Sequence, residues 1–341
     1  MEERISDNGV SLSDAPGPIV LMSFNRPDYL GEVIQSLLVQ ENCQIEEREF
    51  HLFQDNAVNK ISGERYAEDK DIEASVKVFQ QLVPNGTVHL SPDNIGVAMN
   101  FDRAEKYVFL ERKFRSAIFF EDDMVLGKYY VDTIQRLLDF AESPAAQGKV
   151  GYVAAFVMHR ATADQQEKRQ RDIVEMGHAW GYGVNRSHWL DVREVIDPYI
   201  QIVSQCDYRA RPKARIGGVH KSLGFATRSL SQDAMKMLAT TWLGRVRLMP
   251  FVCQARYIGE KGRNVTPEAF EKKGYGKEVL FDRRVNDFEW PTVDQLVEMN
   301  AKERAGFEQT CREAYGDRDL PVPPQGTFRA SEHRPVVVSV A

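Results

Sequence analysis

The stretch Ala117-Ile-Phe-Phe-Glu-Asp-Asp123 decides the fold, because its apolar residues are followed at once by three acids. An apolar run with two aromatic side chains is typical of a strand covered on both faces. Three adjacent carboxylates are too costly to bury there, so Glu121, Asp122 and Asp123 must emerge at its carboxyl end. Ligands bind at that end in open α/β sheets, and clustered carboxylates suit Mg²⁺ or Mn²⁺ bridging to phosphates. The plainer alternative is a strand that runs into an acidic turn.

Strands and helices are predicted to alternate before this stretch, on the basis of short apolar runs and of apolar residues at helical spacing. The predicted strands are 18–24, 50–53, 88–90 and 117–120, and the predicted helices between them are 28–40, 72–82 and 97–110. Such alternation indicates a parallel sheet with right-handed crossovers. We therefore expect an α/β fold with a mostly parallel central sheet flanked by helices.

Polar residues follow each predicted strand at the point where it ends. Arg26, Asp55 and Asn94 come after the first three strands, as the acids come after the fourth. Because the carboxyl ends of parallel strands share one edge, we expect these side chains to lie together. Arginine makes planar, bidentate contacts to phosphate, so the set suits a nucleotide pocket. Taken singly, Arg26 before a proline is more simply a turn residue, and Asp55-Asn56 is a good turn pair.

The second half of the chain has a less regular pattern. Helices are predicted at 129–141 and 292–315, strands at 150–157 and 248–258, and an exposed loop or helix at 161–173. Gly181 and Gly183 lie between aromatic residues. They indicate either close approach of a ligand such as a sugar or a glycine-bearing strand packed in the core.

Two further segments carry candidate site residues. Asp233 falls in the first turn of a helix predicted to start at Ser231, where an acid also simply stabilises the helix end. Lys261 belongs to a glycine-rich polar loop at 259–266, which either closes over phosphates or is a surface turn.

Composition limits the class of protein. The chain has 341 residues, a net charge of −6 and 43% hydrophobic residues. With no basic surplus, it is not expected to bind nucleic acid. Its start resembles no signal peptide, and no apolar run reaches the roughly 18 residues of a membrane span, so we expect a cytoplasmic protein without a transmembrane segment. The four cysteines are isolated and are predicted to be reduced and mostly buried.

The chain is expected to divide into three parts. A flexible leader covers 1–17, a catalytic domain covers 18–290, and a C-terminal helix and tail cover 291–341. The catalytic domain is expected to have a nucleotide-binding half at 18–126 and an acceptor half at 127–290.

Several of these motifs resemble one family. Phe24-Asn-Arg-Pro-Asp-Tyr-Leu30, Gln54-Asp55 and Glu121-Asp122-Asp123 resemble the donor-binding half of N-acetylglucosaminyltransferase I and its relatives, which are inverting glycosyltransferases of the GT-A fold. Segments 181–189, 244–250 and 259–262 resemble later parts of that family in the same order, over about residues 18–270. The segment 94–100 also resembles bacterial family-2 transferases.

The resemblance implies a role for each candidate residue. By this resemblance Arg26 would bind the diphosphate, Asp55 and Asn94 would flank the nucleobase, and Glu121 and Asp122 would support the nucleotide. Asp123 would bind the metal, and the loop with Lys261 would close over the donor. Asp233 would be the general base. Three features depart from the family: Asn94 stands in place of a histidine, Ser231-Gln232-Asp233 replaces a tryptophan and acid pair, and the segment 197–230 is longer. The donor sugar and the acceptor therefore stay open.

The resemblance implies a Mn²⁺-dependent or Mg²⁺-dependent glycosyltransferase. It would move a sugar with inversion from a nucleotide sugar, such as a UDP-sugar, to a hydroxyl of a glycan or glycoconjugate acceptor, with Asp233 as base. If Asp233 is only a helix cap, Asp207, the next acid in the acceptor-side segment, is the alternative base. A nucleotidyltransferase is one alternative, but the first strand is not followed by the glycine-rich basic loop usual in that class. An inactive glycan-binding or nucleotide-binding module is another, and the intact acid cluster argues against it.

Overall fold

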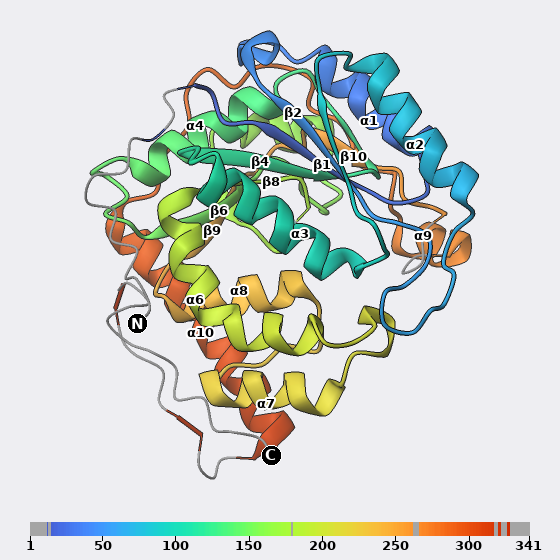
Figure 1. Cartoon of the computed structure of the whole chain (residues 1–341). Helices are drawn as coiled ribbons and strands as arrows, with labels where there is room; N and C mark the ends of the chain where they lie inside the picture. The colour runs from blue at the N-terminus through green and yellow to red at the C-terminus, as the bar shows by residue number, and fades with distance from the viewer. Residues whose placement is uncertain are drawn as a thin grey trace.

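The computed structural model describes residues 12, 15–178, 180–261, 266–316, 320–321 and 326–327. An eight-stranded sheet with the order β3-β2-β1-β4-β8-β6-β9-β7 crosses the molecule (Figure 1). Its strands are β1 (Ile19–Ser23), β2 (Phe50–Gln54), β3 (Thr87–Leu90), β4 (Ser116–Glu121), β6 (Val150–Ala154), β7 (Ile173–Glu175), β8 (Tyr182–Asn185) and β9 (Val246–Pro250). A separate antiparallel pair is formed by β5 (Met124–Leu126) and β10 (Ala255–Tyr257).

The central sheet is mostly parallel, as predicted. β3, β2, β1 and β4 run in the same direction, and β6 and β9 are parallel to each other. β8 runs antiparallel to both β4 and β6, and β7 runs antiparallel to β9. The strands of the first half therefore deliver their carboxyl ends to one edge.

Helices cover both faces of the sheet (Figure 1). On one face lie α1 (Pro27–Leu38), α2 (Asp69–Leu82) and α4 (Tyr130–Glu142), and on the other lie α3 (Gly96–Lys106), α6 (Arg186–Val203) and α8 (Gln232–Trp242). The remaining helices are α5 (Ala163–Lys168), α7 (Lys213–Leu223), α9 (Pro267–Lys273) and α10 (Val293–Tyr315). Each face has its own apolar core, because strands buried on both sides present alternate side chains to the two helix layers.

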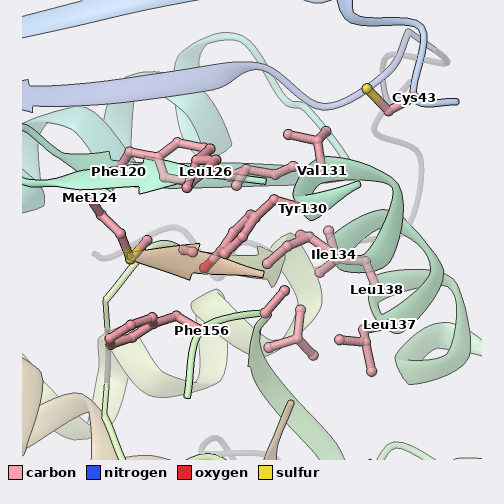
Figure 2. Packing of buried hydrophobic residues seen from close by; sticks show 14 of the residues in the cluster. Cys43, Phe120, Met124, Leu126, Tyr130, Val131, Ile134, Leu137, Leu138 and Phe156 are labelled. Carbon is pink, nitrogen blue, oxygen red and sulfur yellow. The ribbon is translucent and has the colours of Figure 1, made fainter. Parts of the chain in front are cut away.

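The glycines of the segment around β8 face one of these cores, whereas Tyr182 and Val184 belong to the other. Figure 2 shows Met124 and Tyr130 in the cluster between β4 and α4. The Tyr130 hydroxyl donates to the carbonyl of Gly181 at 2.6 Å, and a Cβ on Gly181, which has φ of +55°, would clash with Met124. A Cβ on Gly183 would lie 2.6 Å from Ile134. The packed-core interpretation accounts for both glycines.

Some elements differ from the predicted ones. The predicted helix at 97–110 ends as α3 at Lys106 and continues as a π-helical turn, Tyr107–Glu111. The predicted strand at 248–258 is two strands, because the chain leaves β9 after Pro250 and pairs with β5 only from Ala255. The exposed segment 161–173 contains the short helix α5.

The remaining expectations concern the cysteines, membrane-spanning helices and the two ends of the chain. All four cysteines are free, with Cys206 half-buried and the others buried. Within the described ranges, every helix is too short or too polar to cross a membrane. Most of the expected leader and of the expected tail lies outside the described residues.

Candidate active site

The candidate site lies where the strand order reverses. β1 and β4 are neighbours in the sheet, with Met22 paired to Glu121, while the chain goes from β1 outward to β2 and β3 before it returns to β4. The helices after β1 and β4 diverge at such a point and leave a crevice beyond the strand ends, where ligands bind in open α/β sheets. Arg26 follows β1 at the N-terminus of α1, so it faces the acids that follow β4.

Arg26 and two of the acids are in direct contact. Its guanidinium forms ion pairs with Asp122 and with Asp123, the latter at 2.9 Å between Nη2 and Oδ2. Nε also donates to Asp122 at 3.3 Å. Burial alone would lower the pKa of Arg26, but the two carboxylates raise it. The structure thus brings together the first and fourth strand ends as predicted.

The acids at this edge form one electrostatic cluster. Burial raises the pKa of Glu121 well above its usual value, and Asp123, Asp233 and Asp122 raise it further. The pKa of Asp123 is about 6, mainly because of burial, although Arg26 lowers it. Asp233 comes from α8, far away in the sequence, and still lies close enough to act on Glu121. The four carboxylates outnumber the two cations that act on them, Arg26 and Lys236, which leaves an excess of negative charge.

This donor set fits a hard divalent cation. Within the described part of the chain, no group of three or more Asp, Glu, His or Cys side chains is arranged to hold a metal ion. Mg²⁺ and Mn²⁺ sites in nucleotide enzymes commonly use one or two carboxylates and complete their coordination with substrate phosphates and water. Asp123 suits that role, because Arg26 engages only its Oδ2.

Asp233 is not the residue that caps its helix. Ser231 is the N-cap of α8, and its hydroxyl accepts from the amide of Ala234 at 3.3 Å. The Asp233 carboxylate instead accepts a hydrogen bond from the side chain of Gln232. Burial raises the pKa of Asp233 to about 6, while Lys236 lowers it and Glu105 raises it. A carboxylate with this pKa is suited to take a proton near neutral pH.

The alternative base, Asp207, is already saturated with donors. It accepts from Ser62 Oγ at 2.7 Å, from Tyr66 and from the amide of Arg209 at 2.8 Å. Although burial raises its pKa, these hydrogen bonds lower it below the usual value. Asp207 is therefore a poor candidate for a base.

A buried polar network behind Asp233 was not predicted from the sequence. Lys236 donates to Glu105 Oε1 at 2.5 Å and to the Tyr182 hydroxyl at 3.1 Å, and Trp189 Nε1 donates to Glu105 Oε2 at 3.1 Å. The positions of its charged residues could have been found from helical spacing. Glu105 stands four residues after Phe101 on the apolar face of α3, and Lys236 stands three residues after Asp233.

Asp55 and Asn94 form a second group at the same edge. Asp55 accepts from the amides of Asn56, Ile95 and Gly96 at 2.9 to 3.0 Å and from Asn94 Nδ2 at 3.0 Å. The carboxylate is 5% exposed, and both of its oxygens are occupied. Asp55 therefore fixes the turn between β3 and the start of α3. Contacts of Asp55 and Asn94 with the nucleobase of a donor remain a prediction.

The chain after β10 folds back over the acids. The amide of Ile258 donates to the carbonyl of Asp123 at 2.8 Å, and the amide of Lys261 donates to the Tyr29 hydroxyl at 3.2 Å. Arg26 lies 5.5 Å from the Tyr29 ring. Lys261 is exposed beside this group, whereas residues 262–265 of the predicted loop lie outside the described residues.

An aromatic pair adjoins the same edge. The rings of Trp180 and Tyr257 are stacked with their centroids 4.8 Å apart. Burial raises the pKa of Tyr257, and the charges of Asp123, Arg26 and Glu121 also act on it, which places its hydroxyl near the acid cluster. Trp180 is half-buried, and its ring also stacks on that of Phe156.

Comparisons with known proteins give only distant similarity. No protein-family model and no curated protein matches the chain. Among solved structures, the mannosyltransferase PcManGT from Pyrobaculum calidifontis, in complex with GDP-Man and Mn²⁺, has 11% identity and a TM-score of 0.44, over 89% of this chain and 76% of that chain.

S. aureus TarS gives similar values. The TarS structure has 13% identity and a TM-score of 0.40, over 75% of this chain and 38% of that chain. Its fragment 1–349 has 12% identity and a TM-score of 0.41, over 89% of this chain and 75% of that chain. Similarity at this level establishes neither activity nor substrate.

Proposed function

We propose that this chain is a metal-dependent glycosyltransferase that moves a sugar from a nucleotide sugar to a hydroxyl of a glycan or glycoconjugate. The observation that carries the proposal is the convergence of Arg26, the acids Glu121 to Asp123 and Asp233 at the reversal of strand order. The motif resemblance to N-acetylglucosaminyltransferase I supports a UDP-sugar as donor and inversion at the anomeric carbon.

Arg26 would hold the donor diphosphate. A guanidinium binds phosphate through two parallel hydrogen bonds, and Arg26 already lies at the mouth of the crevice, paired with Asp122 and Asp123. The metal, held by Asp123, would supply electrostatic stabilisation of the departing diphosphate. Lys261 would add a cation on the outer side of the same diphosphate.

Asp233 would act as the general base. Its carboxylate takes the proton from the acceptor hydroxyl while that oxygen forms a bond to the anomeric carbon and the bond from that carbon to the diphosphate breaks. The acceptor and the leaving group lie on opposite faces of the sugar, so the configuration is inverted. Asp233 comes from α8, whereas Arg26 and Asp123 follow the ends of β1 and β4, and we place the sugar between them.

Product analysis tests this function. The protein is incubated with Mn²⁺ and a panel of UDP-sugars and GDP-sugars, and the products are identified by nuclear magnetic resonance. We expect slow, Mn²⁺-dependent release of nucleoside diphosphate by hydrolysis even without an acceptor. Formation of nucleoside monophosphate, or of a nucleotide sugar from a sugar phosphate and a nucleoside triphosphate, would instead identify a nucleotidyltransferase.

A further inference from the structure

One segment next to the candidate site has a charge opposite to that of the whole chain. Residues 208–232, called here the basic segment, contain six of the 44 lysines and arginines and none of the 50 acids. The chain as a whole has a net charge of −6. The cations of the segment are Arg209, Arg211, Lys213, Arg215, Lys221 and Arg228.

Contacts of its ends place the basic segment beside the site. Tyr208 packs against Gly96 at the start of α3, where a Cβ on the glycine would lie 2.7 Å from the Tyr208 Cβ. The Tyr208 hydroxyl accepts from the amide of Gln232 at 3.3 Å, one residue before Asp233. Arg211 Nε donates to the carbonyl of Leu230 at 3.2 Å, which joins the two ends of the segment. The segment is thus a loop closed at the base-bearing helix, with α7 at its outer side (Figure 1).

Several charges of the segment are not neutralised. Lys213, Arg215 and Arg228 are exposed, and Lys221 is half-buried. None of these four side chains forms a hydrogen bond or an ion pair with another residue in the described part of the chain. The neighbouring acid Asp207 is occupied by Ser62 and Tyr66.

Two of these cations lie where a cation disfavours the fold. Lys213 and Arg215 are in the first turn of α7, which has no acid there. The positive end of the helix dipole makes a cation in the first turn unfavourable by about 0.3 to 1 kcal/mol. Local stability therefore does not explain these charges, whereas binding of an anion would.

We propose that the basic segment binds phosphate groups of the acceptor, so that the acceptor is a phosphate-bearing glycan or polymer. This inference rests on the proposed transferase function. Four of the six cations are arginines, which bind phosphate in a planar, bidentate manner. Lys213 and Lys221 stand at the two ends of α7, about 12 Å apart along the helix, so the segment can contact more than one phosphate. The donor diphosphate is bound separately, by Arg26.

A charge-reversed variant and a matched control test the proposal. In Lys213→Glu/Arg215→Glu the new acids suit the first turn of α7, so the fold is expected to persist. The control, Lys70→Glu/Lys77→Glu on α2, has the same change of net charge at two exposed residues. The probe is fluorescently labelled inorganic polyphosphate, and its binding is followed by anisotropy at low and high salt.

The unmodified protein should bind polyphosphate, and binding should weaken steeply with salt. The Lys213→Glu/Arg215→Glu variant should bind about tenfold or more weakly, as expected when two phosphate contacts are lost, and the control should bind nearly as well as the unmodified protein. Equal weakening in both variants, or no binding by the unmodified protein, would overturn the proposal.

Two further measurements separate the possible failures. Vesicles of phosphatidylglycerol and phosphatidylcholine replace polyphosphate in a parallel titration; binding to vesicles alone would show a membrane-docking surface and contradict an acceptor site. Stabilisation by UDP with Mn²⁺ is measured for all three proteins and should be the same. If it is missing even in the unmodified protein, the transferase function itself fails, whatever the polyphosphate result.

Discussion

Among single residues, Asp233 distinguishes an enzyme from a binding module. Because Ser231 caps α8, the N-cap hydrogen bond of this helix does not depend on Asp233. Asp233→Asn should fold normally and bind the donor, yet lose about a hundredfold or more in transfer rate. Ser231→Ala is the matched control and should lose about 1 kcal/mol of stability while it keeps its transfer rate. Transfer by Asp233→Asn within a few-fold of the unmodified rate would exclude Asp233 as base.

The pH dependence of transfer follows from the same residue. The pKa of Asp233 is about 6, raised by burial, and the base must be ionised to accept a proton. The rate should therefore fall about tenfold per pH unit below about pH 6 and be level above it. A rate of transfer that does not change between about pH 7 and about pH 5 would contradict the assignment.

The imidazole of His220 has no polar partner among the residues that the structure describes, and it should destabilise the protein in acid. Its side chain is fully buried, neither ring nitrogen is hydrogen-bonded, and burial lowers its pKa to about 4. In the unfolded chain the imidazole takes up a proton near pH 6.5, whereas the native state resists protonation until about pH 4. The free energy of unfolding therefore falls progressively as the pH drops from about 6.5 towards 4. Between about pH 7 and about pH 5 the unmodified protein should lose about 2 kcal/mol more of its free energy of unfolding than His220→Leu does. Urea titrations at the two pH values measure this, and a constant difference would contradict it.

Site residues differed in how far the sequence could predict them. Arg26 and the acids Glu121 to Asp123 were predictable, because each lies at or shortly after the end of a strand and the parallel sheet brings strand ends together. Glu105 and Lys236 lie within helices, and their pairing depends on how α3 packs against α8. No periodicity in the sequence fixes that packing.

At the scale of elements, the ion pair of Glu105 and Lys236 joins α3 to α8 behind the base. Both side chains are buried, so Lys236→Met leaves a carboxylate without its counter-charge and should cost about 3 kcal/mol or more of stability. Adding Glu105→Gln should recover a large part of that loss. Because Lys236 lowers the pKa of Asp233, the acid limb of the pH profile of Lys236→Met should also move to higher pH. Additive losses in the double variant would contradict a coupled pair.

The second half of the fold was less predictable than the first. No helix was predicted at α6, which contains Pro198, a residue type that usually ends a helix. The buried residues on one side of α6, among them Trp189, Tyr199 and Val203, pack in the core and outweigh the loss of one backbone hydrogen bond. β8 has two residue types that disfavour strands, glycine and asparagine, and pairs with β4 and β6 because larger side chains fill the space beside Gly183.

At the scale of the whole molecule, the sheet edge explains why residues far apart in sequence act together. Arg26, Asp123 and Asp233 come from the first, second and last thirds of the chain and meet where the strand order reverses. The burial and mutual repulsion of the acids disfavour the ligand-free state, since burial together with Asp123, Asp233 and Asp122 raises the pKa of Glu121 well above its usual value. A metal and a diphosphate that bind there should therefore stabilise the whole fold.

Thermal unfolding with UDP and Mn²⁺ tests this central claim most directly. For a ligand at a hundred times its dissociation constant, the gain in stability is about 2.7 kcal/mol, which is readily seen as a rise in the unfolding temperature. We predict such a rise for the unmodified protein only when both UDP and Mn²⁺ are present, and its loss in Asp123→Ala, which should unfold at a normal temperature without ligand. An equal rise in Asp123→Ala, or no rise with any nucleotide in the unmodified protein, would contradict the account.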